Sequence, residues 1–233
     1  MAAHVASANP VTKLRCEGTL ERELRARGFT SIAGVDEVGR GSLFGAVFAA
    51  AVILSPDRQI RGLNDSKQLE AERREVLAER IRERAVCWAV AAVDAAMIDR
   101  INIYQASRLA MKRAVEQLSP AADFLLIDAV PLELTIPQQP LIHGDARCHA
   151  IAAASIIAKV ARDACMRVWD EIYPQYGLAS HKGYNTPEHL KALEQFGPTP
   201  LHRASFEPVR ARYLFPLDDG QLELFALEAS ACH

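Results

Sequence analysis

One stretch decides the predicted fold: Gly34-Val35-Asp36-Glu37-Val38-Gly39-Arg40-Gly41-Ser42. It follows the apolar run 32–35 and precedes a second apolar run, 43–54. Two strands joined by a polar, glycine-rich turn have this pattern. The stretch therefore predicts a pair of neighbouring strands, with two carboxylates near the point where the first strand ends.

Asp36 and Glu37 are adjacent acids. Neighbouring side chains of a strand point to opposite faces, so the two can share a site only where the strand ends or bulges. Acids placed together repel each other unless they are protonated or neutralised by a cation, and oxygen-rich sites suit Mg²⁺ or Mn²⁺. Arg40, between Gly39 and Gly41, adds a cation and backbone N–H groups that a ligand can approach closely. The alternative is a charged turn on a solvated surface.

Composition limits the class of protein. The chain has 233 residues, half of them apolar, which suits one domain of generous size. No uncharged apolar run approaches the roughly 20 residues of a membrane span, and the N-terminus lacks the pattern of a secretory signal. The five cysteines form no Cys-x-x-Cys pair, which favours reduced thiols over disulfides or a zinc site. We therefore expect a cytoplasmic protein that does not enter a membrane.

Charge is unevenly distributed along the chain. The net charge is −2, but residues 214–233 hold four acids and no Lys or Arg. The rest of the chain has 25 acidic against 27 basic residues. A basic face for nucleic acid is therefore compatible with the composition.

Strands and helices are expected to alternate, which predicts an α/β fold. The expected strands are 31–36, 45–54, 85–93, 123–128 and a short one at 141–142. The expected helices are 19–27, capped by Thr19, then 70–84, 95–100, 103–118 and 148–172. A helical C-terminal part is expected from about residue 172.

Two further acids stand where the first pair needs help. Asp128 ends the apolar run 124–127, and active sites of open α/β sheets gather at such strand ends. Asp145 lies just before the long helix 148–172, where an N-cap acid is also expected. Either residue alone has a structural explanation, as a strand-end polar group or a cap. Four carboxylates together can hold two divalent ions, one activating water and one stabilising the leaving oxygen of a phosphodiester.

Six motifs occur in order between residues 18 and 210. They are residues 34–41, Asn64-Asp65-Ser66-Lys67, Ile127-Asp128, Gly144-Asp145 with the helix sequence 151–160, His181-Lys182-Gly183-Tyr184, and His202-Arg203-Ala204-Ser205-Phe206. In this order and spacing they resemble the signature of ribonuclease HII, the type 2 ribonuclease H. The resemblance implies an RNase H-like fold with a mixed central sheet flanked by helices. It implies metal-dependent cleavage of RNA in RNA–DNA hybrids and incision 5′ of single ribonucleotides in duplex DNA, leaving 3′-hydroxyl and 5′-phosphate ends.

The sequence pattern divides the chain into four parts. We expect a flexible N-terminus at 1–17, a core at 18–171, a helical part at 172–213 and an acidic tail at 214–233. The resemblance implies that the core is catalytic and that the helical part binds substrate.

Roles follow from the resemblance residue by residue. Its metal and catalytic residues are Asp36, Glu37, Asp128 and Asp145, which would hold Mg²⁺ or Mn²⁺. Gly39, Arg40 and Gly41 would read the ribose 2′-hydroxyl, the group that distinguishes RNA from DNA. Tyr184 would pack on the deoxyribose side of an RNA-to-DNA junction, although a tyrosine on an ordinary surface fits the sequence as well.

Basic and hydroxyl side chains could hold phosphates, which positions a duplex without reading its sequence. Ser66 and Lys67 are the first candidates, with a helix cap and a solvated lysine as the alternative. Lys159, Arg162, Lys182 and Arg203 could also line a groove, with an ordinary surface position as the favoured interpretation.

Three residues depart from the family pattern. His143 stands where a lysine is expected, Cys148 where a serine is commoner, and Asn185 where a glycine usually follows the tyrosine. With His149, the first two could form a softer ligand set for Zn²⁺ or Mn²⁺. Asn tolerates positive φ better than most residues, so Asn185 can replace glycine. None of the three removes a predicted metal ligand.

The acidic tail contains a second resemblance, in Gly220-Gln221-Leu222-Glu223-Leu224-Phe225. It is similar to short peptides that dock on the bacterial sliding clamp, through Gln221, Leu222, Leu224 and Phe225. The alternative is a terminal helix whose apolar side chains cover the core.

Ribonuclease HII competes with two other functions and with a nearer relative, ribonuclease HIII. A DNA-only or junction-resolving nuclease would not need the ribose-sensing residues Gly39, Arg40, Gly41 and Tyr184. Ribonuclease HIII has an extra N-terminal domain, for which the residues before Asp36 are too few. A non-catalytic clamp adaptor would not need four strand-end acids. Ribonuclease HII activity is therefore the expected function, and the resemblance implies a monomer.

Overall fold

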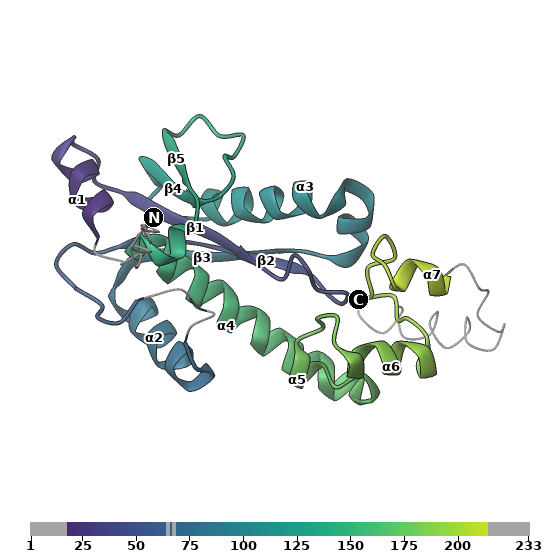
Figure 1. Cartoon of the computed structure of the whole chain (residues 1–233). Coiled ribbons are helices and arrows are strands. Elements are labelled where there is room, and N and C mark those ends of the chain that lie inside the picture. Colours follow the sequence, from purple (N-terminus) through teal and green to yellow (C-terminus); the bar gives the residue numbers. More distant parts are fainter. Residues whose placement is uncertain (1–17, 64–65, 67–68, 214–233) are drawn as a thin grey trace, which may run out of the picture.

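The computed structural model describes residues 18–63, 66 and 69–213 (Figure 1). Helices and strands follow one another in the alternating order that the sequence predicts. None of the helices in this described part is long and apolar enough to cross a membrane. The predicted N-terminal segment 1–17, Lys67 and the tail 214–233 lie outside the described residues.

A five-stranded mixed sheet forms the centre of the molecule. Its strands are β1 (Ile32–Val38), β2 (Val47–Leu54), β3 (Ala85–Val93), β4 (Phe124–Asp128) and β5 (Gln138–Leu141). Their order in the sheet is β3-β2-β1-β4-β5. The pairs β1–β2 and β2–β3 are antiparallel, and the pairs β1–β4 and β4–β5 are parallel. The predicted α/β class with a mixed central sheet is confirmed.

Helices cover both faces of this sheet (Figure 1). Helix α3 (Ala95–Glu116) packs on one face, and α2 (Ala71–Arg84) and α4 (His149–Ile172) pack on the other. Helix α3 contains the non-helical residue Asn102, with φ 68°, so it has a kink where the sequence predicts the break between two helices. Helix α1 (Thr19–Ala26) precedes β1; its N-cap is Gly18 and no side chain caps it, so the prediction that Thr19 is the cap is wrong.

The alanine-rich start of α4 lies very close to β1. Gly34 makes this possible, because a Cβ atom there would lie 2.0 Å from the backbone carbonyl carbon of Ala150. The small side chains Ala152, Ala153 and Ala154 are fully buried in the same layer. The close approach fixes where α4 passes the end of β1, and so it sets the geometry of the residues described next.

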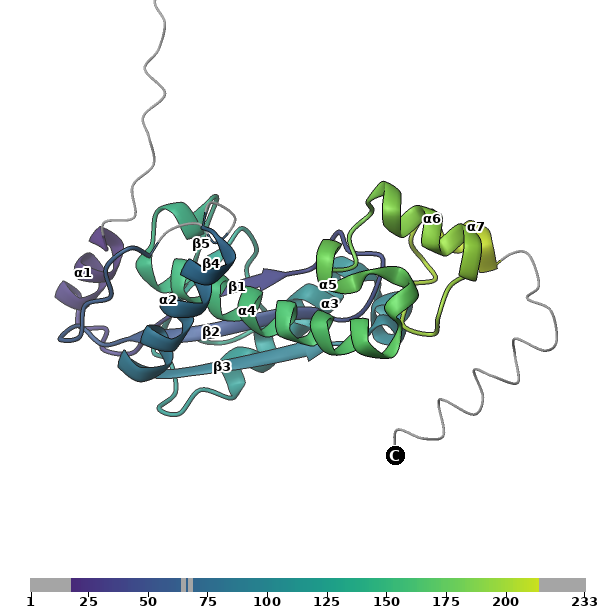
Figure 2. The same ribbon diagram turned by 90° about the horizontal axis from the view of Figure 1, so that it is seen from below.

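A smaller helical part follows α4 and has its own core (Figure 2). It contains η3 (Pro174–Tyr176), α5 (Leu178–His181), α6 (Pro187–Phe196) and α7 (Val209–Tyr213). Leu43 and Phe44, which follow the glycine-rich turn, are buried in this second core. Two isolated bridges, Ser42 with Tyr184 and Phe44 with His202, join the turn to it. The turn therefore lies between the sheet and the helical part.

Candidate active site

Asp36 and Asp128 lie side by side on neighbouring strands. The parallel register pairs Val35 with Ile127, so the two acids occupy the next position on β1 and β4. Val35 and Ile127 are buried on the α3 side of the sheet. Because side chains alternate along a strand, both acids face α4. The structure therefore brings together the first and third of the predicted acids.

Asp36 is only 6 % exposed. Burial raises its pKa well above the ordinary range, and the charges of Glu37 and Asp128 raise it further. Hydrogen bonds from the Ser155 hydroxyl and from the Glu37 N–H, whose nitrogen lies 2.7 Å from Oδ1, lower the pKa. They do not compensate for burial and repulsion.

Glu37 follows Asp36 and lies one residue before β1 ends. Because side chains alternate along a strand, its side chain points to the other face of the sheet. Burial raises its pKa and the charge of Asp128 raises it further, whereas Arg40 lowers it. The Arg40 Nη1 lies 3.3 Å from Glu37 Oε1. The charge of Asp128 thus acts on both acids of the β1 pair.

Asp145 lies in η2 (Gly144–Ala146), between β5 and α4, and is 7 % exposed. The backbone of this turn is tied to Asp128, because the Gly144 N–H donates to Asp128 Oδ1 at 2.8 Å. Asp145 is not the N-cap of α4, which is Cys148. Glu21 of α1 instead accepts from the Ala150 N–H at 3.0 Å, so the alternative explanation of Asp145 as a cap is wrong.

The acids point toward separate partners. In the described part of the chain, no three acidic, histidine or cysteine side chains are close enough together to form a ligand set for a metal ion. Glu37 pairs with Arg40, and Asp128 accepts from the Gly144 N–H. The donor set still fits a hard divalent cation, since such an ion takes carboxylate oxygens and would relieve the repulsion on Asp36.

A fully buried arginine holds the glycine-rich turn. Arg203 donates from Nη2 to the Gly39 carbonyl and from Nη1 to the Arg40 carbonyl, both at 2.8 Å, and from Nε to the Gly45 carbonyl at 3.0 Å. It is 0 % exposed, so the expectation that Arg203 lies on the surface is wrong. Three carbonyls replace water around the guanidinium, which permits its burial.

Arg162 of α4 is the second buried arginine, and the surface position favoured for it is also wrong. Its Nη2 donates to Ser42 Oγ and to the Lys182 carbonyl, both at 2.8 Å. It leaves no room beside Gly39, where a Cβ atom would lie 2.3 Å from Arg162 Nε and φ is +92°. Gly41 differs, because nothing lies within 4 Å of a Cβ atom built there.

Tyr184 contacts both the glycine-rich turn and Arg162. It forms the bridge with Ser42, and its ring centroid lies 5.2 Å from the Arg162 guanidinium. The ring is partly exposed. The structure therefore brings Tyr184 to the glycine-rich turn, although the two are about 140 residues apart in sequence.

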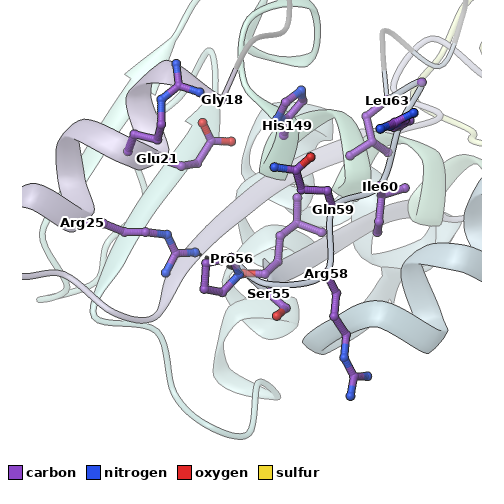
Figure 3. Close-up of a pocket in the computed structure, with 14 residues that line it drawn as sticks. Gly18, Glu21, Arg25, Ser55, Pro56, Arg58, Gln59, Ile60, Leu63 and His149 are labelled. Carbon is purple, nitrogen blue, oxygen red and sulfur yellow. Dashed lines mark hydrogen bonds between the residues drawn. The ribbon is translucent and has the colours of Figure 1, made fainter.

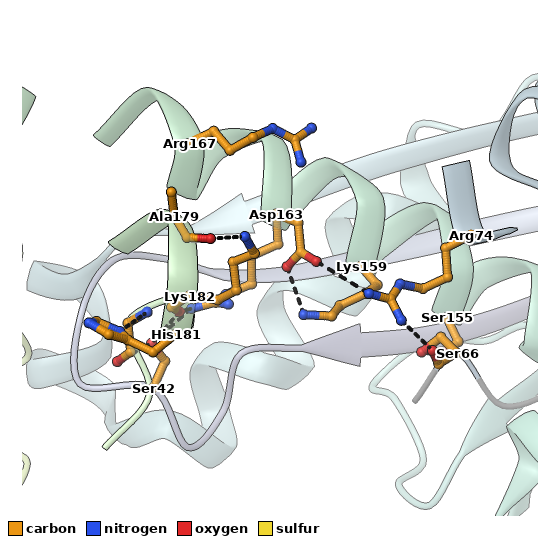
Figure 4. Close-up of polar contacts among 12 residues, drawn as sticks. Ser42, Ser66, Arg74, Ser155, Lys159, Asp163, Arg167, Ala179, His181 and Lys182 are labelled. Atoms are coloured by element: carbon orange, nitrogen blue, oxygen red, sulfur yellow. Dashed lines mark hydrogen bonds and ion pairs between the residues drawn. The ribbon is translucent and has the colours of Figure 1, made fainter. Parts of the chain in front are cut away.

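Ser66 is 3 % exposed, and its hydroxyl lies 2.8 Å from that of Ser155 (Figure 4). Since Ser155 hydrogen-bonds to Asp36, Ser66 supports the acid site from behind. Contact of Ser66 with a phosphate stays a prediction, and Lys67 lies outside the described residues.

A hollow of about 360 Å³ lies farther along α4, where α2 and the segment 180–182 approach it (Figure 4). Asp163 binds two cations there, Lys159 Nζ at 2.7 Å and Arg74 Nη2 at 3.9 Å. Burial lowers the pKa of Lys159, although Asp163 opposes the shift. Arg167 and Lys182 also line the hollow, so its cations outnumber its acids, Asp163 and Glu75.

Another pocket, of about 570 Å³, lies at the opposite end of β1, between α1, the end of β2 and the start of α4 (Figure 3). Arg22, Arg25, Arg58 and Arg61 line it with Glu21 and His149. None of the predicted catalytic residues reaches it.

The predicted softer ligand set is not assembled in the described residues. His143 is exposed, with φ 55°, whereas Cys148 is buried and its Sγ lies 3.2 Å from Glu21 Oε1. Asn185 is exposed and is not among the residues with positive φ. The tail residues Gln221, Leu222, Leu224 and Phe225 lie outside the described part of the chain.

The sequence interpretation missed the residues behind the site. Ser155 and Arg203 lie inside the motifs named above, whereas Ser42 and Arg162 lie just beyond theirs. Only the fold reveals that all four side chains point inward. The placement of Ser42 directly after Gly41, followed by buried Leu43 and Phe44, was the one available signal for a buried hydroxyl.

Comparisons with known proteins agree on one family. The family model described as Ribonuclease HII matches residues 33–209. Ribonuclease HII of Solibacter usitatus is 74 % identical over 220 residues, covering 94 % of this chain and 96 % of that protein. Among solved structures, the ribonuclease H2 of Pyrococcus horikoshii is similar with a TM-score of 0.66 and 25 % identity, covering 78 % of this chain and 96 % of that one. The PCNA:RNase HII complex of Archaeoglobus fulgidus is similar with a TM-score of 0.66 and 25 % identity, covering 81 % of this chain and 99 % of that one. These structures confirm the predicted RNase H-like fold.

Proposed function

This chain belongs to the ribonuclease HII family and is a ribonuclease H that cleaves the RNA strand of RNA–DNA hybrids, and on that basis we propose how it does so. Asp36, Glu37, Asp128 and Asp145 hold divalent metal ions, Mg²⁺ or Mn²⁺, and form the catalytic site. The enzyme also incises 5′ of a single ribonucleotide in duplex DNA and leaves 3′-hydroxyl and 5′-phosphate ends.

One observation carries the proposal: Asp36 and Asp128 occupy matching positions near the ends of neighbouring parallel strands, on the same face, with the Asp145 turn tied to Asp128. Burial and mutual repulsion raise the pKa of Asp36 and of Glu37. Buried carboxylates with pKa values perturbed by one another are typical of functional sites, and a bound cation would relieve their repulsion. When bound, two divalent ions supply an activated water and stabilise the leaving oxygen.

The protein's own groups orient the site. Ser155 donates to Asp36, and Ser66 supports Ser155. The Gly144 N–H fixes one oxygen of Asp128. Such support limits the motion of carboxylates that must hold a substrate phosphate in line with water.

The ribose sensor is the backbone of Gly39, Arg40 and Gly41. Arg203 takes the carbonyls of Gly39 and Arg40, which leaves the opposite side of the turn for a ligand. Open space beside Gly41 supports a close approach of the sugar. Contact with the 2′-hydroxyl would distinguish RNA from DNA at that position.

The duplex lies across α4 and the helical part 172–213, the substrate-binding part in this proposal. The hollow lined by Arg74, Lys159, Arg167 and Lys182 supports phosphate binding. Arg74, which lines this hollow, donates to the Ser66 carbonyl at 3.0 Å, and Lys67 is the next residue in the sequence. Phosphate contacts of this kind position the duplex without reading its sequence.

The tail docks on the sliding clamp through Gln221, Leu222, Leu224 and Phe225. The Archaeoglobus ribonuclease HII was solved in complex with PCNA, which supports a clamp partner for this chain. Deletion of residues 220–233 is expected to abolish clamp pull-down and to spare cleavage of a short duplex. Unchanged pull-down would reject the tail as the docking segment. The enzyme otherwise acts as a cytoplasmic monomer.

One assay tests the activity. The protein is incubated with Mg²⁺ or Mn²⁺ and duplex DNA carrying one ribonucleotide, beside all-DNA and long-hybrid controls. A nick on the 5′ side of the ribonucleotide is expected, lost in Asp36→Asn and Asp128→Asn variants that still bind. Glu116→Gln, an exposed acid of α3, is the matched control and keeps full activity. Equal cleavage of all-DNA duplex would favour a DNA nuclease instead.

A further inference from the structure

Three histidines lie together in the helical part, away from the acids. The rings of His181 and His189 stack, with centroids 4.5 Å apart and planes 16° apart. The rings of His189 and His202 lie 5.3 Å apart, and their Nε2 atoms are 3.1 Å apart. His189 and His202 are fully buried, so solvent does not supply their hydrogen-bond partners.

The hydrogen-bond partners fix where the protons lie. The Thr199 N–H can only donate, and it lies 2.9 Å from His202 Nδ1, which must therefore accept. The proton of neutral His202 is then on Nε2, and it points to His189 Nε2. That atom must accept in turn, so the proton of His189 is on Nδ1, from which it donates to the Tyr184 carbonyl at 2.9 Å. The chain of hydrogen bonds has one consistent direction.

The same reasoning shows which ring nitrogen of His181 carries the proton. The Gly183 N–H donates to His181 Nδ1 at 3.1 Å, so Nε2 carries the proton and donates to the Tyr176 carbonyl at 2.7 Å. Burial lowers the pKa of His189 to about 4 and of His202 to about 3. Neutral rings at neutral pH agree with the directions given by the partners.

The series of hydrogen bonds through the histidines ends at the Tyr184 carbonyl. The Tyr184 carbonyl also accepts from the Thr186 N–H at 2.9 Å, and its N–H donates to the His181 carbonyl at 3.0 Å. On the other side, Tyr184 meets Ser42 and the Arg162 guanidinium. The backbone of Tyr184 is therefore held between the histidines and the glycine-rich turn.

We propose that His189 and His202 are positioning residues, which hold Tyr184 at the depth and angle from which its ring tests the sugar of an RNA-to-DNA junction. This inference rests on the junction-checking role proposed for Tyr184. Neither histidine touches the substrate. They act through the backbone of Tyr184, so their loss misplaces the ring without removing it.

Substrate comparison tests the proposal. The value of kcat/KM is measured on a duplex with a single ribonucleotide, which has the junction, and on a long hybrid. For His189→Leu the ratio of the two is expected to fall about tenfold, since small misplacements of a positioned group cost rates of that order or more. His202→Gln retains a donor toward His189 and is expected to keep the ratio, whereas His202→Leu lowers it. Tyr176→Phe, which removes a hydrogen bond to Gly197 in the same core, is the matched control and leaves the ratio unchanged.

Tyr184→Ala separates the two proposals. If Tyr184→Ala does not change the ratio of the two kcat/KM values, the junction-checking role proposed for Tyr184 is wrong. If Tyr184→Ala lowers the ratio and His189→Leu lowers activity on both substrates equally, the positioning role is wrong. The double variant is expected to match Tyr184→Ala alone, because both changes act through one ring.

A measurement on the unaltered protein avoids variants that fail to fold. The ¹⁵N shifts of its imidazoles report which nitrogen carries each proton. His189 is expected as the Nδ1–H form, and His202 and His181 as Nε2–H forms. An Nε2–H form of His189 would overturn the proposal, because its donor to Tyr184 would be missing.

Discussion

Asp36 is buried beside two other acids, and this placement opposes folding. A carboxyl whose pKa is raised in the folded state costs folding free energy at pH values where the unfolded chain carries it ionised. Such sites are common where function requires them. The same feature that weakens the fold prepares the site for a cation.

Asp36→Asn is expected to abolish cleavage and to raise the free energy of unfolding by about 1–3 kcal/mol at pH 7 without metal. The folded-state pKa is raised, so the wild-type penalty is full above that pKa and disappears as pH falls toward about 4, the unfolded value. Urea titrations at pH 7 and pH 4 in a chelator measure this. A variant that is less stable than the wild type at pH 7 would contradict it.

Gly39 and Gly41 give a matched pair of substitutions. Gly39→Ala places a Cβ against the buried Arg162 at φ +92° and is expected to cost about 2 kcal/mol or more of stability. Gly41→Ala meets nothing within 4 Å, so stability should change by less than about 0.5 kcal/mol while cleavage next to a ribose falls. Thermal unfolding and the single-ribonucleotide assay measure the two effects. Similar destabilisation by both would refute the assignment.

At the scale of the elements, the positions of most strands and helices could be predicted from the sequence, whereas the long-range contacts between buried side chains and backbone could not. Apolar runs located four strands, and the strand 85–93 agrees with β3 at both ends. The short strand predicted at 141–142 was misplaced, because β5 is the polar segment Gln138–Leu141 and shares only Leu141 with the prediction. Local sequence carries this information because strand and helix periods differ. It carries none about which buried arginine meets which carbonyl, since Arg203 lies 164 residues from Gly39. Asp36 and Asp128 were found from strand ends, whereas Ser155 and Arg162 needed the packing of α4 on β1.

Helix α4 sets the site because Gly34 lets it approach. Gly34→Ala would place a Cβ 2.0 Å from backbone of Ala150, which no rotamer change can relieve. We expect a loss of about 3 kcal/mol or more, with Ser155 moved away from Asp36. Chemical denaturation measures it, with Gly41→Ala as the control glycine. Near-normal stability would mean that α4 can shift without cost.

At the scale of the whole molecule, the glycine-rich turn and α4 both join the sheet core to the core of the helical part. The sheet core and the core of the helical part meet at residues 39–45, where Arg203 and Arg162 bind the turn. The acids lie on the sheet side and Tyr184 on the helical side. Alignment of the acids with the junction sensor therefore depends on the stability of the helical part as well as on the sheet.

Acid is expected to weaken the helical part first. The folded-state pKa values of His189 and His202 are lowered to about 4 and about 3, so unfolding takes up protons as pH falls below about 6.5. The histidine contribution is fully present above that value and decreases by about 2–4 kcal/mol between pH 7 and pH 5. Asp36 and Glu37 act in the opposite direction, because their raised pKa values favour protonation in the folded state. Unfolding of wild type and of His189→Asn/His202→Gln at both pH values separates the two effects, since the acids are unchanged and their contribution cancels in the comparison. A pH dependence equal in both proteins would show that the buried histidines do not link protonation to folding.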